Sequence, residues 1–380
     1  MKPTLYRPIF ICMVLLVIGQ LPLSSTPAKE MIPNTPLVQE ANGTMQLLII
    51  LSPQYAQDLD IINALQFYTV AVQNDLHWKS KIIPITPQEN DFQIIDTIIE
   101  QYYRTDGIKA CLMVGEDLDT ALAGDSDYLE QPSVIPWATT GGPSSYEMTH
   151  NGILCQPYTI NICISLLYPT HALPYETKKA NLINALTKFA TQRHASFPKT
   201  ISVFESSDLS ASSRPLYQHL LQFGQLMYQE DPNDEELQQS LSQSYAIYMV
   251  HGHSTPAGTD VSSRNNTGWF SADNLNHIQT PLFCADGCYT SGWWSNQSDN
   301  DKLDPSCGAT WYGSKIFTSP SIHVMALGLL SQNGFCTPVS FIENVLPKFL
   351  SGKTLAESMI GGCSIGDTII VGDPTFHFTE

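Results

Sequence analysis

The segments AIYMVHG, residues 246–252, and LFCADGC, residues 282–288, decide the expected fold. Each begins with an apolar run typical of a strand that is buried on both faces. Each also carries a reactive side chain at or just after the end of that run, His251 in the first and Cys288 in the second. Functional groups in α/β sheets collect at the carboxyl ends of parallel strands. We therefore expect two neighbouring parallel strands to bring His251 and Cys288 together.

The same alternation of strands and helices extends through the chain. The expected strands cover residues 47–51, 81–85, 110–114, 160–167, 200–204 and 368–371. The expected helices cover residues 58–74, 92–103, 175–191, 216–228, 235–243, 321–330 and 342–350. A strand–helix–strand order implies parallel strands joined by right-handed crossovers.

The predicted fold class is therefore α/β, with mostly parallel sheets flanked by helices in two subdomains. A Ser-rich stretch at residues 206–213 breaks the pattern. It separates an expected first α/β subdomain, residues 45–205, from a catalytic α/β subdomain, residues 214–380.

The N-terminus has the order of a secretory signal peptide. Lys2 and Arg7 precede an apolar run from Ile9 to Gly19, and small residues follow as far as Ala28. We expect a signal peptide at residues 1–28 and a linker at residues 29–44, and hence a secreted, periplasmic or cell-surface protein. An uncleaved anchor is the alternative. No second apolar stretch of about 18 residues follows, so no integral membrane segment is expected after cleavage.

Composition limits the function classes. The 380 residues are 43% hydrophobic and 14% charged, which is enough apolar material for a sizeable core. The formal net charge is −18, and no run of Lys and Arg is present to neutralise phosphates. Nucleic acid is therefore excluded as an expected partner. The sequence specifies no oligomeric state.

Nine cysteines are present, and Cys12 lies in the signal peptide. Export permits disulfides, but the sequence does not determine which cysteines pair.

His251 and Cys288 have the chemistry of a nucleophile and its base. A thiol attacks efficiently only as a thiolate, and a histidine within hydrogen-bond reach can take its proton and pass it to a leaving amine. The backbone N–H groups of Gly252 and Cys288 are expected to form an oxyanion hole. Two neighbours compete for these roles: Cys284 lies inside its strand, and His253 lies two residues beyond His251.

Other residues are candidates for the surrounding cleft. These are His253, Asp286, Trp293 and Trp294. Asp286 either orients His251 or caps a turn, and the tryptophans either pack in the core or form walls of a side-chain pocket.

Two other functions are compatible with the same residues. His251 and His253 are potential zinc ligands, with Asp260, Asp286 or Cys288 completing the site of a zinc hydrolase. The second alternative is an inactive exported protein of the same fold that binds a partner.

Residues 245–294 resemble the catalytic core of the gingipain family, within the caspase-fold (clan CD) cysteine peptidases. The matching segments of this core are YMVHGHS at 248–254, ADNL at 272–275 and PLFCADGC at 281–288. Two further matches flank it, GATWYGS at 308–314 and VGDPT at 371–375. The resemblance implies a caspase-like fold and a cysteine endopeptidase with Cys288 as nucleophile and His251 as base. It further implies protein or peptide substrates, no required cofactor, and structural calcium as a possible addition.

The chain departs from the family at two points. Residues 165–169, SLLYP, lack the family's Gly-Arg pair, and residues 143–146, PSSY, lack the acid found before a Tyr in Arg-specific members. The resemblance therefore does not extend to a preference for Arg or Lys. Other acids in the chain leave this choice open: Asp125, Asp127, Glu147 and Asp260.

Overall fold

The computed structural model describes most of the chain beyond residue 44. The described residues are 45–118, 121–123, 131–139, 159–263, 268–288, 290–291, 311–328, 341–361 and 368–379. All of them belong to one compact unit, Glu40–Glu380. The expected signal peptide and linker lie outside the described residues. No helix in the described ranges is both long enough and apolar enough to cross a bilayer.

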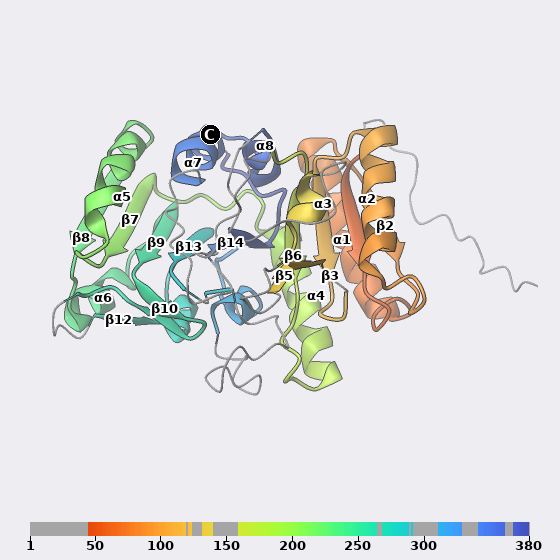
Figure 1. Ribbon diagram of the computed structural model, residues 1–380, viewed down its shortest axis with the longest axis horizontal. Helices are drawn as coiled ribbons and strands as arrows, with labels where there is room; N and C mark the ends of the chain where they lie inside the picture. Colours follow the sequence, from red (N-terminus) through yellow and green to blue (C-terminus); the bar gives the residue numbers. More distant parts are fainter. Residues whose placement is uncertain are drawn as a thin grey trace, which may run out of the picture. The chain divides into compact units, whose positions relative to one another are not determined.

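A ten-stranded sheet forms the centre of this unit (Figure 1). In spatial order its strands are β2 (Lys79–Pro84), β1 (Met45–Leu51), β3 (Ala110–Val114), β6 (Cys163–Leu167), β15 (Ile369–Gly372), β14 (Val324–Leu327), β13 (Leu282–Asp286), β9 (Ile247–His251), β7 (Thr200–Glu205) and β8 (Gln225–Glu230). The structure thus confirms an α/β fold with a large, mostly parallel sheet flanked by helices.

The sheet consists of two parallel blocks that run in opposite directions. Strands β2, β1, β3, β6 and β15 are mutually parallel, as are β14, β13, β9, β7 and β8. Among the described strands of this sheet, only the β14–β15 pair is antiparallel. The carboxyl ends of the two blocks therefore lie at opposite rims of the sheet.

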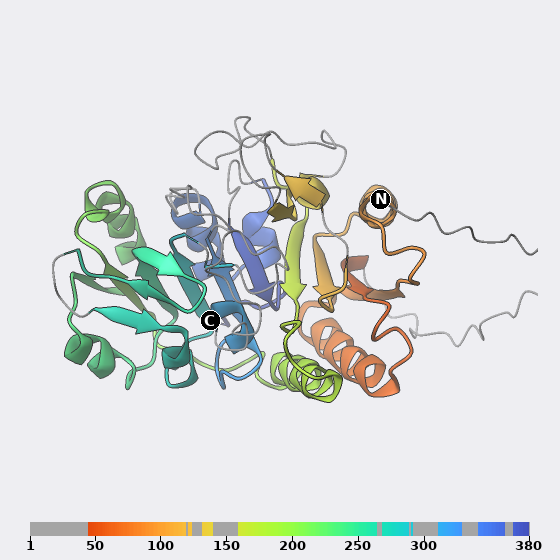
Figure 2. The same cartoon turned by 60° about the horizontal axis from the view of Figure 1, so that its bottom comes forward.

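The helices cover both faces of the N-terminal block. Figure 2 shows α1 (Leu59–Leu76) and α4 (Tyr175–Thr191) on one face, with α2 (Phe92–Asp106) and α3 (Ile135–Thr139) on the other. Asp58 and Asp91 cap α1 and α2 by accepting hydrogen bonds from N–H groups of the first turn, which would otherwise lack partners. The helices expected at residues 58–74, 92–103 and 175–191 correspond to α1, α2 and α4, and each prediction is confirmed within three residues at both ends.

The remaining elements are short. They are β4 (Ala121–Ala123), β5 (Gln131–Ser133), α5 (Ser210–Tyr217), α6 (Asp234–Ser240), β10 (His253–Thr255), β11 (Gly258–Asp260), β12 (Trp269–Ser271), α7 (Leu346–Leu350) and α8 (Leu355–Met359), with 3₁₀ turns at Gln218–Gln222, Ala272–Asn276 and Tyr312–Ile316 and a π-helical turn at Phe341–Val345. Strands β10, β11 and β12 form a separate antiparallel sheet beside the C-terminal block.

Two helix predictions are wrong. The helix expected at residues 321–330 is replaced by β14, whose four residues are all buried between β13 and β15. A short apolar run buried on all sides has the same pattern in a helix and in a strand. In place of the helix expected at residues 216–228, the structure has the end of α5, the 3₁₀ turn Gln218–Gln222 and then β8. A Cβ at Gly224 would lie 2.0 Å from the carbonyl oxygen of Lys199, so the chain passes too close there for a side chain.

The Ser-rich stretch at 206–213 lies inside the C-terminal block. It connects β7 to β8, and these two strands pair with each other. Conversely, β15, from the end of the chain, pairs with β6 of the N-terminal block. The two blocks therefore do not coincide with the expected ranges 45–205 and 214–380.

The segment at 371–375 is held by α1 and by Arg193, which lies just beyond the end of α4. Asp373, fully buried, pairs with Arg193 at 3.1 Å and accepts a hydrogen bond of 2.6 Å from the Tyr68 hydroxyl. Arg193 also pairs with Asp75 at 2.6 Å. Removing one partner from such a buried network leaves an uncompensated charge, so this segment serves stability.

Candidate active site

Three side chains stand in one row across the C-terminal block. Glu205, His251 and Asp286 are the last residues of β7, β9 and β13. His251 is the register partner of both carboxylates, Glu205 on one side and Asp286 on the other. Register partners in a sheet point to the same face. The histidine ring therefore lies between two carboxylates at the rim where the strands end.

Glu205 holds one nitrogen of the ring. Its Oε1 lies 2.5 Å from His251 Nδ1, and the Glu205 side chain is fully buried. The other carboxylate oxygen accepts a 2.7 Å hydrogen bond from the Tyr228 hydroxyl. A carboxylate fixed in this way sets the orientation and tautomer of the imidazole, as the acid does in catalytic triads.

Sequence analysis did not identify Glu205. The signal was present, because Glu205 ends the apolar run TISVF at the carboxyl end of a strand, the same position that singled out His251. A buried charged group at that position needs a partner.

Asp286 faces the other nitrogen. Its Oδ2 lies 3.2 Å from His251 Nε2. Burial lowers the pKa of His251, but the charge of Asp286 and the hydrogen bond to Glu205 outweigh it and raise the pKa overall. The imidazolium is therefore stabilised relative to that of an unperturbed histidine.

Cys288 follows Asp286 by two residues and is partly exposed. The pKa of its thiol is raised by burial and by the charge of Asp286, against a smaller opposing effect of its own backbone N–H. In this arrangement the thiol form of Cys288 is favoured over the thiolate. Cys284, by contrast, is buried inside β13, and its pKa is raised further.

The glycines of the two motifs serve chain packing. A Cβ on Gly252 would lie 2.0 Å from the Asp260 carbonyl oxygen, and one on Gly287 would lie 2.0 Å from the Ser254 hydroxyl. The N–H of Gly252 donates to the carbonyl oxygen of Asp286 at 3.1 Å. The expectation that this N–H lines an oxyanion hole is therefore wrong for this conformation, because the group already has an acceptor in the sheet.

Of the other predicted cleft residues, the structure describes His253. His253 is on β10, its side chain is 61% exposed, and its Nε2 lies 2.9 Å from Asp208. Trp293 and Trp294 lie outside the described residues.

A small cavity lies beside His251 and Asp286. Its volume is about 20 Å³, room for roughly one water molecule. Tyr217, Cys284 and Phe341 are among its walls. The Tyr217 hydroxyl is buried and has no hydrogen-bond partner among the described residues.

The four cysteines in the described ranges form no disulfide there. They are Cys111, Cys163, Cys284 and Cys288. The other four cysteines beyond residue 28 lie outside those ranges: Cys155, Cys307, Cys336 and Cys363.

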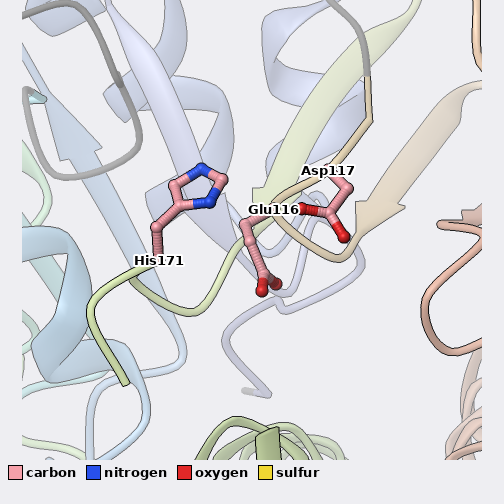
Figure 3. Close-up of side chains that lie close together, drawn as sticks. All are labelled: Glu116, Asp117 and His171. Atoms are coloured by element: carbon pink, nitrogen blue, oxygen red, sulfur yellow. The ribbon is translucent and has the colours of Figure 1, made fainter. Parts of the chain in front are cut away.

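One group in the described ranges has the composition of a metal site, and it lies at the opposite rim. Glu116, Asp117 and His171 bring their ligand atoms within 4.8 Å of one another (Figure 3). Glu116, however, already pairs with the Lys178 ammonium and accepts a hydrogen bond of 3.0 Å from Tyr55. The buried carboxylate is thus neutralised by a residue of the chain. His251 and His253 do not gather with a third ligand among the described residues.

A comparison with known protein families found no model that matches this chain. A comparison with curated proteins found no similar one.

Proposed function

We propose that the protein is an exported cysteine endopeptidase with Cys288 as nucleophile, His251 as base and Glu205 as the residue that orients His251. The observation that carries the proposal is the row at the strand ends, where Glu205 fixes Nδ1 of His251 and Cys288 follows the neighbouring strand. A nucleophile, a base and an orienting acid are the parts that acyl transfer requires. The gingipain resemblance supports the same assignment, and a caspase-like arrangement belongs to this proposal.

The reaction follows from these roles. Nε2 of neutral His251 takes the thiol proton, and Sγ of Cys288 attacks the peptide carbonyl carbon. The C–N bond breaks as His251 gives the proton to the leaving amine, which leaves a thioester on Cys288. A water molecule, deprotonated by His251, then attacks the thioester. This step releases the carboxylic acid and restores the thiol.

Hydrolysis of a fluorogenic peptide library, diverse at the residue before the cleaved bond, tests the proposal. The protein should lack residues 1–28 and be kept in reducing buffer, with and without EDTA. We expect turnover that survives EDTA and is lost in Cys288→Ala and His251→Ala. Cys284→Ala is the matched control, since it removes a neighbouring thiol that is not assigned to catalysis.

Two outcomes contradict the proposal. Loss of turnover with EDTA alone favours the zinc hydrolase. No turnover, together with a Cys288 that does not react with iodoacetamide, favours the inactive binding protein.

A further inference from the structure

The two carboxylates beside His251 have opposite consequences for Cys288. A base that serves Cys288 needs one nitrogen anchored and the other directed at the thiol. Glu205 supplies the anchor at Nδ1, 2.5 Å away. Asp286 lies 3.2 Å from Nε2, the nitrogen that the thiol requires.

We propose that Asp286 is a latch, a side chain that occupies Nε2 of His251 in the resting site and keeps this nitrogen from Cys288. The inference rests on the proposed function and adds a regulatory contact to it. The Asp286 carboxylate takes the place beside the imidazole that a Cys288 thiolate takes in the active arrangement. Both are anions that the imidazolium attracts on its Nε2 side, and the Asp286 Oδ2 already lies 3.2 Å from Nε2 there, so only one of them can be the close partner of Nε2 at a time.

The backbone supports a contact that is built into the fold. His251 and Asp286 are register partners on adjacent parallel strands, and the N–H of Gly252 donates to the Asp286 carbonyl oxygen at 3.1 Å. This backbone bond belongs to the main chain and survives any change of the Asp286 side chain. The side chain can therefore be replaced without removing a bond of the sheet.

The charges around the imidazole favour the latched form. Glu205 on β7, Asp208 after β7 and Asp286 on β13 all stabilise the imidazolium. Half-buried Tyr228 and buried Tyr217 contribute hydroxyls that are neutral at physiological pH. Asp286 also acts directly on the thiol, because its negative charge opposes formation of a thiolate two residues away. Neutralising Asp286 therefore frees Nε2 and makes the thiolate easier to form.

The test is the rate at which iodoacetamide alkylates Cys288, followed from pH 5 to pH 10 by mass spectrometry of the peptide that contains this residue. The variants are Asp286→Asn, which removes the charge and keeps the size, and Asp286→Ala, which removes both charge and acceptor. We expect about tenfold faster alkylation at pH 7 in Asp286→Ala, with a smaller gain in Asp286→Asn. The midpoint of the rate profile should move to lower pH, since one pKa unit corresponds to a tenfold change in thiolate below the midpoint.

Two matched controls separate the latch from a general charge effect. Asp208→Asn removes a nearby negative charge that does not contact Nε2 of His251, and we expect the alkylation rate to change by less than about threefold. Glu205→Gln removes the negative charge that fixes Nδ1, and we expect slower alkylation. Slower or unchanged alkylation in both Asp286 variants overturns the latch and makes Asp286 a second orienting acid or a bystander.

Alkylation and peptide hydrolysis distinguish the latch from the proposed function. Faster alkylation of Cys288 without hydrolysis by any variant supports the latch and contradicts the peptidase. Hydrolysis by the wild type without faster alkylation in the Asp286 variants contradicts the latch alone.

Discussion

The two rims of the sheet carry similar residues in different electrostatic surroundings. At the rim of the N-terminal block, His171 lies beside Glu116 and Asp117, and burial and Lys178 lower its pKa against the opposing charges of those acids. At the rim of the C-terminal block, Asp286 and Glu205 raise the pKa of His251 in spite of burial. Burial lowers the pKa at both sites. Glu205 is hydrogen-bonded to His251, whereas Glu116, which pairs with Lys178, acts on His171 through its charge.

The largest expected effect separates the two histidines by activity. We expect His251→Ala to lower kcat/KM for peptide hydrolysis by at least about 10³-fold, because it removes the base. His171→Ala should leave kcat/KM within about twofold of the wild type, since it lies at the other rim. Steady-state kinetics on the best library peptide measures both. Equal losses of kcat/KM in the two variants would show that residues at both rims are needed for hydrolysis.

The second effect tests the neutralising lysine. Lys178→Met leaves the Glu116 carboxylate, whose side chain is fully buried, without its cation. We expect a loss of about 3–5 kcal/mol in the free energy of unfolding, measured by urea denaturation. The double variant Lys178→Met, Glu116→Gln should recover most of this loss. A loss below about 1 kcal/mol in the single variant would show that Lys178 does not neutralise Glu116.

A smaller effect is expected at Glu205. Glu205→Gln keeps the shape of the side chain and removes the charge that fixes His251 Nδ1. We expect kcat/KM to fall by about 10²-fold, with the acidic limb of the pH profile moving to lower pH, as the pKa of His251 falls. Tyr228→Phe removes one hydrogen bond to Glu205 and should cause a milder change in the same direction. An unchanged pH profile in Glu205→Gln would argue against an orienting role.

The smallest effect is the pH dependence of stability, which should have opposite sign at the two rims. The raised pKa of His251 adds stability that is present below its unfolded pKa, near 6.5, and is lost as the pH rises through the folded pKa. The lowered pKa of His171 costs stability as the pH falls below about 6.5 toward its folded pKa. Urea denaturation from pH 5 to pH 8 should therefore show that His171→Gln loses less stability on acidification than the wild type, and that His251→Gln loses more. The same pH trend in both variants would contradict the prediction that the two histidines affect stability with opposite sign.

The fold was predictable where a local pattern had one solution. Helices α1, α2 and α4 and strands β1, β3, β9 and β13 follow from apolar spacing, with end points within a few residues. Strand β14 was not predictable, because a short buried run has no period that distinguishes a strand from a helix. The reversal of direction at β14–β15 also depends on pairing between residues far apart in the chain.

The candidate site was predictable only in part, because it too depends on how residues far apart in the chain pair. The placement of His251 at the end of β9, beside the strand that leads to Cys288, is confirmed. The position of Gly252 predicted that its N–H binds the substrate oxyanion. In the structure, a glycine is needed at this position because the backbone of Asp260 passes too close for a side chain. A glycine signals close approach without saying what approaches.

By itself, the sequence determined an α/β sheet of buried strands and the two strand ends where a histidine and a cysteine follow apolar runs. Only the tertiary structure decided that His251 lies between Glu205 and Asp286, because strand register sets which residues face each other across a sheet. It also decided that Glu116 has a lysine partner, Lys178, which depends on how helices pack against strands. Local pattern fixes which residues end a strand, whereas the pairing of distant segments fixes the charges that each of them meets.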